Sequence, residues 1–395
     1  MRARRLLFAS VLPLLLVMMA LPALSEDAFT PVIASALRPA TFAVLGTDNK
    51  LHLVYELVIT NTGSAPATIE KIDVVSGDAS AKVVASFEGD ALHARLRATG
   101  RGEEAVSPIE SSGSRLFLVD FTMDKDSHPP ATLLHRFHLM AAGPPGSPKG
   151  ETVPYTDTMA PISVGTDVTV LGPPLEGKGW VAFNGCCEPT GIHRGSALSV
   201  NGQIYFAQRF AIDWMLLYPD AKVFHGDGKS VKDYAGYGVK VIAVADGTVV
   251  DTLANLDNQI PGILPDPKSI TIKNVDGNHI VLDLGHGKYA FYAHLQKDSL
   301  LVSMGDHVKR GQVLALLGNT GNTSAPHLHF HLMDGASVLG SSGLPYVIDH
   351  FAVAGQLPAA QFNASGIDGE WSKDLSAHPS SKKSEFPLDL TVVDF

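Results

Sequence analysis

The stretch PHLHFH at residues 326–331 places three imidazoles at alternate positions, namely His327, His329 and His331. Successive side chains of a β-strand point to opposite faces, so all three rings would lie on one face and the apolar residues between them on the other. Imidazole is a frequent zinc ligand, and a strand is a rigid mount for it. The pattern therefore predicts a strand that carries a metal or catalytic site. The alternative is an ordinary polar surface strand.

The sequence around this stretch predicts further short strands. Residues 199–205 read as a hairpin with an Asn-Gly turn, and residues 239–251 read as two strands about an Asp-Gly turn. Residues 279–284 and 289–295 alternate like an antiparallel pair. Because helical periodicity is scarce, we expect an antiparallel β-sheet domain over residues 181–355.

The preceding residues, 26–150, predict a separate β-rich domain. Runs at residues 51–61, 67–75 and 114–122 have the alternation of strands and are separated by turn signals. Strands at this spacing suggest an immunoglobulin-like β-sandwich, so we expect the whole chain to be all-β. No catalytic constellation occurs in this part, which we interpret as a spacer or binding module of unknown role.

Composition marks the segments outside these two domains. Glycine and proline cluster at residues 143–150, and residues 151–180 are expected to link the two domains. Residues 356–395 are weakly patterned and read as a C-terminal tail, in which residues 388–393 have the composition of an edge strand. The chemistry is therefore expected within residues 181–355.

The first 25 residues have the pattern of a secretory signal peptide. Three arginines precede an apolar run, and small residues stand where a signal peptidase would cut before Glu26. An uncleaved anchor helix is the alternative. We expect an exported protein, periplasmic or secreted, with no membrane span once the signal is removed.

The size and charge of the chain limit its partners. Its 395 residues suit two domains, and a hydrophobic fraction of 45% with a charged fraction of 18% indicates a globular protein. The formal net charge is −10 and no basic stripe is visible, so a nucleic acid is not expected as a partner.

The two cysteines, Cys186 and Cys187, are adjacent. Neighbouring cysteines rarely bridge each other, because the small ring strains the peptide between them. We therefore expect two thiols or, less favoured, metal ligands. An exported protein without an ordinary disulfide would depend on its hydrophobic cores for stability.

Several blocks of the sequence resemble the lysostaphin-type (LytM-type) zinc metallopeptidases. They are a G-x-T-G loop before an H-L-H-F strand, a Y-x-H-L block, a V-x-x-G-x-x-V-x-x-G strand and a strand-turn-strand. In this chain they lie at residues 318–321 with 327–330, 292–295, 302–311 and 241–249. Their order and spacing match the family over about residues 190–350. The resemblance implies a C-terminal antiparallel β-sheet metallopeptidase core.

The resemblance also implies a role for individual residues. His329, the second histidine of H-L-H-F, would bind one zinc ion, and Asp213 matches the family's aspartate ligand. His327 would be the general base for the zinc-activated water. His294, opposite it, would stabilise the oxyanion or share the proton transfer. His331 stands where the family often has Glu, and it would orient a ligand or alter the metal site.

The chain departs from the family pattern at the remaining metal ligand. The family usually has His-x-x-x-Asp on one strand, but here Arg209 stands four residues before Asp213 and cannot bind zinc because it stays protonated. The first available replacement is His193. Pairing outward from a turn at residues 201–202 would set His193 opposite Phe210, close to the missing ligand. The alternative is an ordinary exposed histidine, since a bulge would shift that register.

The sequence therefore predicts an exported zinc metalloendopeptidase with metal ligands His193, Asp213 and His329 and catalytic residues His327 and His294. The resemblance suggests peptidoglycan as the peptide substrate. Because the His-x-x-x-Asp pattern is incomplete, a non-catalytic cell-wall-binding or regulatory module on the same fold is the alternative. The sequence does not identify the residues that bind substrate.

Overall fold

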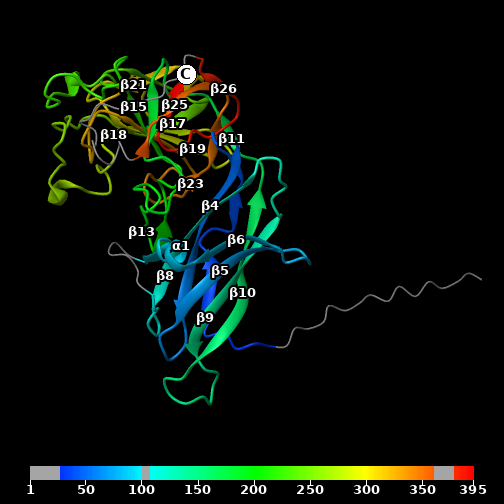
Figure 1. Cartoon of the computed structure of the whole chain (residues 1–395). Coiled ribbons are helices and arrows are strands. Elements are labelled where there is room, and N and C mark those ends of the chain that lie inside the picture. Colours follow the sequence, from blue (N-terminus) through cyan, green and yellow to red (C-terminus); the bar gives the residue numbers. More distant parts are fainter. Residues whose placement is uncertain (1–26, 100–106, 360–377) are drawn as a thin grey trace, which may run out of the picture.

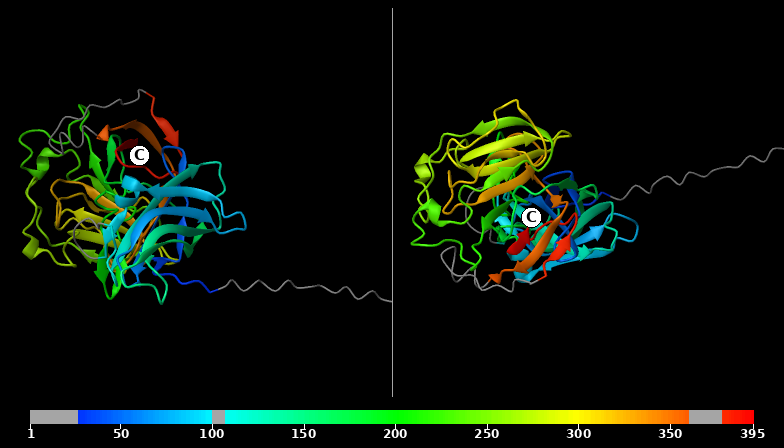
Figure 2. Two further views of the ribbon diagram at one scale, coloured as in Figure 1. Left: turned by 60° about the horizontal axis from the view of Figure 1, so that its bottom comes forward. Right: turned by 90° about the horizontal axis from the view of Figure 1, so that it is seen from above.

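The computed structural model describes residues 27–99, 107–359 and 378–395, which form an all-β protein in two packed parts (Figure 1). The expected signal peptide lies outside the described residues. The described residues include no helix that is both long and apolar enough to cross a membrane. The blue-to-cyan N-terminal part and the yellow-to-red C-terminal part lie against each other in both views of Figure 2.

The N-terminal part is a sandwich of two five-stranded sheets around one hydrophobic core. The first sheet, in the order β1-β4-β8-β7 with β3 beside β4, contains β1 (Val32–Ala36), β3 (Val44–Leu45), β4 (Lys50–Asn61), β7 (Leu96–Ala98) and β8 (Ser114–Asp124). The second, in the order β2-β10-β9-β5-β6, contains β2 (Ala40–Phe42), β5 (Thr68–Ser76), β6 (Val83–Glu88), β9 (Thr132–Ala142) and β10 (Thr152–Gly165). The short helix α1 (Gly89–His93) follows β6. The immunoglobulin-like topology of this sandwich stays a prediction.

Strand β4 is buried on both of its faces. Leu53 and Tyr55 pack in the sandwich core, whereas Val54 and Glu56 point the other way and are buried at the C-terminal part. Val54 belongs to the main hydrophobic core of that second part. A strand covered on both sides reads as a near-continuous apolar run, as the sequence of β4 does, and Glu56 is the charged exception.

The C-terminal part is built on an eleven-stranded antiparallel sheet in the order β20-β17-β18-β19-β22-β15-β12-β27-β25-β26, with β23 beside β22. Its strands are β12 (Trp180–Phe183), β15 (Ile212–Leu216), β17 (Gly247–Leu253), β18 (Asn278–Asp283), β19 (Tyr289–Leu295), β20 (His307–Val308), β22 (Leu328–Met333), β23 (Gly343–Leu344), β25 (Phe351–Gln356), β26 (Ser380–Lys382) and β27 (Thr391–Asp394).

Smaller elements surround this sheet. They are the pairs β11 (Thr169–Leu171) with β24 (Tyr346–Ile348), β13 (Leu198–Val200) with β14 (Gln203–Tyr205) and β16 (Lys240–Ile242) with β21 (Val313–Leu316), and the 3-10 helices η1 (Val231–Asp233) and η2 (Pro267–Ser269). The described residues outside these elements are largely turns and loops.

The segments at the expected domain boundaries take part in the sheets. The Gly- and Pro-rich residues 143–150 are the turn between β9 and β10, and the long strand β10 continues the sandwich well beyond residue 150. In the expected tail, β27 pairs with both β12 and β25, so it lies inside the C-terminal sheet rather than at its edge. Local composition marks these turns, but it does not show which distant strands pair across them.

The alternation of β22 is as its sequence suggests. Leu328 and Phe330 pack in the main core of the C-terminal part together with Trp214 of β15. Asp213 and His329, the cross-strand neighbours on the opposite face, are thereby directed away from that core. The apolar face anchors the two strands, and the opposite face carries polar groups.

Two loops contact each other beside this polar face. Gly277 has a φ of +69°, and a Cβ added to it would overlap the carbonyl group of Thr320. The same carbonyl oxygen accepts a hydrogen bond from Nδ1 of His294 at 2.7 Å, and the Thr320 hydroxyl accepts one from the backbone N–H of Asn278. The close approach therefore requires glycine, and it fixes the acceptor that orients His294.

We expect Gly277→Ala to destabilise the protein more than Gly287→Ala. Both glycines have a φ of +69°, so both variants carry the left-handed backbone strain of roughly 1–2 kcal/mol, but the Cβ at position 287 meets nothing within 4 Å. Overpacking adds about 1–3 kcal/mol at position 277 alone. Denaturant unfolding of the two variants measures the difference. Equal losses of stability in the two variants would show that the loops of Gly277 and Thr320 can move apart at no cost in free energy.

Candidate metal centre

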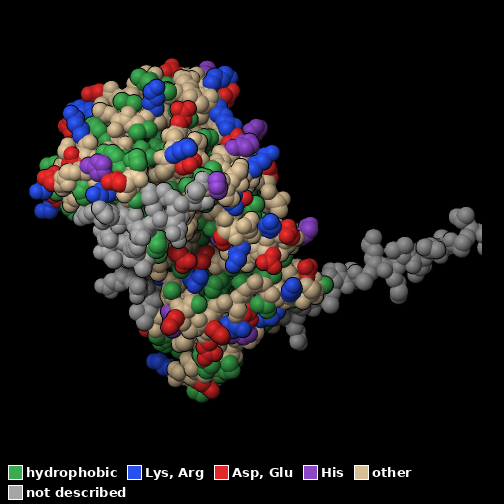
Figure 3. Space-filling view, turned by 45° about the horizontal axis from the view of Figure 1, so that its top comes forward, with side chains coloured by type: hydrophobic (Ala, Val, Ile, Leu, Met, Phe, Trp, Pro, Cys, Tyr) green, Lys and Arg blue, Asp and Glu red, His purple; other side chains and the backbone are tan. Residues whose placement is uncertain are grey.

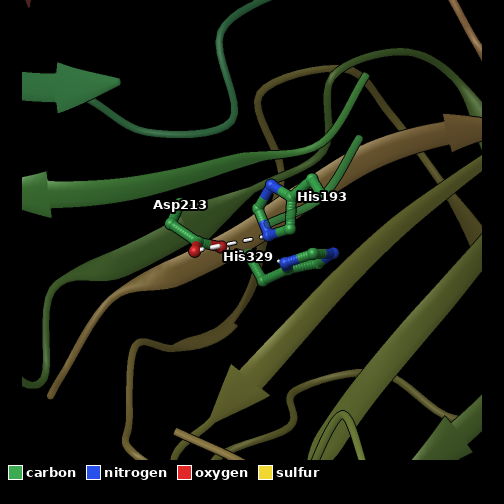
Figure 4. A group of neighbouring side chains, drawn as sticks. All are labelled: His193, Asp213 and His329. Carbon is green, nitrogen blue, oxygen red and sulfur yellow. Dashed lines mark hydrogen bonds and ion pairs between the residues drawn. The ribbon is translucent and has the colours of Figure 1, made fainter. Parts of the chain in front are cut away.

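Asp213 and His329 face each other from neighbouring strands. They are register partners in the β15–β22 pair, and Nδ1 of His329 lies 2.9 Å from Oδ1 of Asp213. Both side chains are buried. Figure 4 shows them pointing toward one another, with His193 completing the group.

His193 reaches the site from a turn rather than from a strand. Its Nδ1 lies 2.8 Å from the carbonyl oxygen of Asn184 and 3.2 Å from that of Ala211, and its Nε2 lies 3.4 Å from Oδ2 of Asp213. The expected hairpin register is correct for β13 and β14, but their pairing begins only at Leu198. His193 therefore does not pair with Phe210, and its position depends on the turn before the hairpin.

One ligand atom from each of His193, Asp213 and His329 lies within 4.8 Å of the other two. The structure thus brings the three sequence-predicted ligands together, and their role as ligands stays a prediction. Arg209 is buried elsewhere: its guanidinium binds Glu56 of the N-terminal part, so it contributes no group to this cluster.

His327 lies beside the same carboxylate, just before β22. Its Nδ1 donates to the carbonyl oxygen of Ala325 at 2.8 Å, and its Nε2 lies 3.3 Å from Oδ1 of Asp213. His329 and His331 are also joined on this face, Nε2 to Nδ1, at 2.9 Å. All three histidines of the PHLHFH stretch thus share one side of the strand.

A β-bulge directs His294 toward the same place. Ala293 pairs with His329, so a regular alternation would turn the next side chain away from the site. The β18–β19 register shifts at this point, and His294 has a φ of +60°. Its ring centroid lies 4.6 Å from that of His327 and 5.8 Å from that of His329. The extra residue of the bulge re-aims the ring, a common use of bulges beside functional sites.

Two polar residues of the site were not found from the sequence. Asn184 donates a hydrogen bond from Nδ2 to Oδ2 of Asp213 at 2.7 Å and supplies a carbonyl acceptor to His193. Asp276 is buried in the cleft wall, and its Oδ2 has no hydrogen-bond partner among the described residues. Neither belongs to a sequence motif, and Asn184 is followed by the two cysteines.

The adjacent cysteines are joined by a disulfide, which the sequence did not predict. Cys186 is buried in the main core of the C-terminal part, and Cys187 packs against that core. Ring strain disfavours such a bridge, but the pair lies in a turn that packing holds on the core. Neither sulfur is a metal ligand in this arrangement.

The protonation states of these side chains are suited to metal binding. Burial raises the pKa of Asp213, but the neighbouring His193 and His327 outweigh it and hold that pKa well below its usual range. Burial lowers the pKa of His329 to about 4, and burial with its histidine neighbours lowers the pKa of His294 well below the usual value. Burial, followed by His329, does the same at His331. Burial lowers the pKa of His193 and of His327, but the carboxylate of Asp213 outweighs it and raises both pKa values. The cluster thus combines an ionised carboxylate with the neutral rings of His294, His329 and His331 and with two rings whose protonated form that carboxylate favours.

The donor set itself is suited to hold a cation. Nδ1 of His193 donates to backbone carbonyls, so in the neutral ring its Nε2 presents a lone pair toward the carboxylate of Asp213. If Nε2 of His329 donates to His331, its Nδ1 likewise presents a lone pair to that carboxylate. Lone pairs that converge on a carboxylate repel each other unless a proton or a metal ion lies between them. Two imidazoles and one carboxylate are the ligand types of open catalytic zinc sites, so these residues fit zinc.

The cluster opens into a cleft of about 1110 Å³ between the two parts of the protein. Its walls include Ala98 and Leu118 from the N-terminal sandwich as well as His294 and His327. Exposed apolar side chains stand along its lining, namely Ile192, Leu264 and Ile272, with exposed fractions of 72%, 60% and 62%. The cleft is therefore open to solvent and apolar along part of its length.

Comparison with known proteins assigns the segment that contains most of these histidines. Residues 228–339 match the model of a family described as "Peptidase family M23". The chain carries a peptidase family M23 domain. The matched segment contains His294, His327 and His329, whereas His193 and Asp213 precede it.

Named relatives match short parts of the chain. The chain is 44% identical over 57 residues to the peptidoglycan DD-endopeptidase ShyA of Vibrio cholerae, and this alignment covers 14% of this chain and 13% of that protein. It is 33% identical over 108 residues to the glycyl-glycine endopeptidase ALE-1 of Staphylococcus capitis, covering 27% of this chain and 25% of that protein. The chain thus spans a quarter or less of the length of these two relatives.

A solved structure is similar only weakly. The catalytic domain of lysostaphin from Staphylococcus simulans aligns at 23% identity and a TM-score of 0.22, covering 42% of this chain and 86% of that domain. A TM-score this low does not establish that the two structures share a fold. The fold of the chain rests on its own strands.

We expect Asp276→Asn to stabilise the metal-free protein increasingly as the pH rises. Burial, followed by the charge of Asp213, raises the pKa of Asp276 from 3.8 to about 7, although His193 opposes the shift. Between those values the folded state binds more protons than the unfolded state, so the stability of the native protein falls as pH rises. The asparagine variant escapes this loss, which is at most roughly 4 kcal/mol.

Denaturant unfolding of both proteins with a chelator at pH 4.5 and pH 8 measures this effect. The variant should gain most of its advantage at the higher pH. A stability difference that is the same at both values would contradict the assignment of a buried, proton-holding carboxyl.

Proposed function

We propose that this protein is an exported zinc metalloendopeptidase that hydrolyses peptide bonds of peptidoglycan. The observation that carries the proposal is the convergence of His193, Asp213 and His329 in an open cleft, with two further imidazoles beside them. The M23 match supports the peptidase class, and the printed names of the relatives support a cell-wall peptide as substrate. The signal-like N-terminus supports export to the periplasm or the outside of the cell.

In this proposal, Nε2 of His193, a carboxylate oxygen of Asp213 and Nδ1 of His329 hold one zinc ion. A zinc ion held there would lower the pKa of a water and polarise a substrate carbonyl. Asn184 holds the carboxylate of Asp213 in place, and His331 does the same for the ring of His329. These outer contacts fix the direction of each ligand.

His327 is the proposed general base. The carbonyl of Ala325 orients its ring, so Nε2 faces the ligand Asp213 and the space around the metal position. A base there can accept a proton from the attacking water and deliver it to the leaving amine. His294, whose Nδ1 donates to the Thr320 carbonyl, presents the unprotonated Nε2 of its neutral ring to the same space, so it is placed to share the proton transfer by accepting a proton.

The cleft suits an extended peptide. It runs past the histidines between the two parts of the protein, and apolar side chains stand along it. On the face drawn in Figure 3, the basic and acidic side chains of the described residues are interspersed. Because Arg97, Asp213 and Asp276 are the Asp, Glu, Lys or Arg residues that line the cleft, we propose that substrate is held there by backbone hydrogen bonds and apolar contacts rather than by a charged surface.

We expect His327→Ala to keep its zinc but to lose hydrolysis by about 100- to 10,000-fold, the usual contribution of a general base. His329→Ala should instead lose the metal, because it removes a ligand. Metal analysis of the dialysed proteins, together with turnover of a fluorogenic peptide, separates the two roles. If His327→Ala lost the metal and His329→Ala kept it, the two assignments would be exchanged.

We expect the wild-type protein, lacking its first 25 residues, to release new amino termini from purified peptidoglycan. A chelator should abolish the release and added zinc should restore it, because the reaction requires the metal position. Glycine-rich peptides serve as a second substrate. A zinc-loaded protein that releases nothing from either substrate would support the non-catalytic binding module instead.

A further inference from the structure

A cluster of three buried charges joins the two parts of the protein. Glu56, on the C-terminal-facing side of β4, is fully buried. Its Oε1 accepts from Nη1 of Arg194 at 2.5 Å and from Nε of Arg209 at 2.8 Å. Its Oε2 accepts from Nη2 of Arg209 at 2.5 Å. Both arginines come from the C-terminal part and are themselves buried.

Backbone carbonyl oxygens accept further hydrogen bonds from the N–H groups of the two guanidinium groups. Arg194 donates from Nη2 to the carbonyl oxygens of Tyr55 and Val119, both in the N-terminal sandwich. Arg209 donates from Nη1 to the carbonyl oxygen of Gly343. Burial raises the pKa of Glu56, but Arg209 and Arg194 outweigh it and hold the pKa below its usual range, so the carboxyl is ionised.

Each of the two arginines lies close in sequence to a proposed metal ligand. Arg194 directly follows His193. Arg209 lies two residues before Ala211, whose carbonyl oxygen is 3.2 Å from Nδ1 of His193, and four residues before Asp213. A single carboxylate therefore ties down both the turn that presents His193 and the start of the strand that presents Asp213.

His193 depends on such a support more than its partners do. Asp213 lies on β15 and His329 on β22, where ladder hydrogen bonds fix both backbones. His193 lies in a turn, outside every strand of the described residues. Its ring contacts the carbonyl oxygens of Asn184 and Ala211 and the carboxylate of Asp213. Its backbone is held by Ser196, which donates to the His193 carbonyl oxygen, and by the anchoring of the next residue, Arg194.

We propose that Glu56 is a positioning residue of the metal centre, through which the N-terminal sandwich holds His193 in its binding direction. The inference rests on the proposed function, since it requires that His193 binds the metal. It assigns the sandwich a role within the site, beyond that of a spacer or binding module. Buried ion clusters of this kind are often no more stabilising than apolar residues of the same volume, whereas their hydrogen bonds define one geometry.

The test compares Glu56→Gln with Val54→Ala in the mature chain. Val54 lies on the same strand, faces the same way and packs in the core of the C-terminal part, but its apolar side chain can form no hydrogen bond or ion pair with either arginine. Zinc affinity is measured by competition with a chromogenic chelator, and the geometry of the site by the visible absorption of the cobalt-substituted protein. Both readouts are independent of catalytic turnover.

Glu56→Gln should weaken zinc binding by about 10- to 100-fold, as loss of an outer support usually does, and should alter the cobalt spectrum. Val54→Ala should lower the unfolding temperature while changing zinc affinity less than about threefold, because it leaves the turn anchored. Equal zinc affinity in Glu56→Gln and wild type would overturn the proposal. So would an equal loss of affinity in both variants, since that would report general weakening of the interface.

A second variant is needed in case Glu56→Gln does not fold, because the Glu56→Gln substitution leaves two buried guanidinium groups without a carboxylate. The triple replacement of Glu56→Leu, Arg194→Met and Arg209→Met removes every charge and keeps the volume. A folded triple variant with weakened zinc binding supports the proposal, and one that binds zinc like the wild type overturns it. If the wild type itself bound no zinc, the proposed function would fail first and this inference with it. If the wild type hydrolyses peptides and binds zinc, and the variants keep the same zinc affinity, only this inference fails and the proposed function stands.

Discussion

The arrangement of the site depends on the pairing register of β15 with β22. That register sets Asp213 opposite His329 and, on the other face, leaves Trp214 and Phe330 in the core. A slip of one residue would reverse both faces, burying the carboxylate among apolar side chains and exposing the aromatic rings. The hydrophobic core therefore fixes the position of the proposed metal ligands. The bulge at Ala293 and His294 then adds a ring that the regular pairing would have pointed away.

The sequence predicted the parts of the site that depend on local pattern. The alternation at residues 326–331 was enough to place three imidazoles on one face, because a strand has a period of two. The Asn-Gly turn correctly set the register of β13 and β14 for the same reason. The all-β class followed from many short strands and few helical periods.

The rest of the site depends on contacts between distant residues. His193 comes to Asp213 through a turn whose shape depends on Glu56, which lies more than a hundred residues earlier in the chain. The direction of His294 depends on a bulge, and a one-residue register shift leaves no mark in the local sequence. Asn184 and Asp276 belong to no motif, and only the folded structure reveals their contacts or their lack of them. The extent of β10 likewise depends on distant contacts, since it is defined by its pairing with β9 and β2.

Strand β4 has its own consequence for how the protein behaves as a whole. Its two faces belong to two different cores, one through Tyr55 and the other through Val54. Opening either core would strip one side of the same strand, so the two cores share a structural element and should lose their order together. The two halves are therefore not independent modules joined by a flexible linker. Replacing either half with a foreign domain would uncover part of the other half's hydrophobic core.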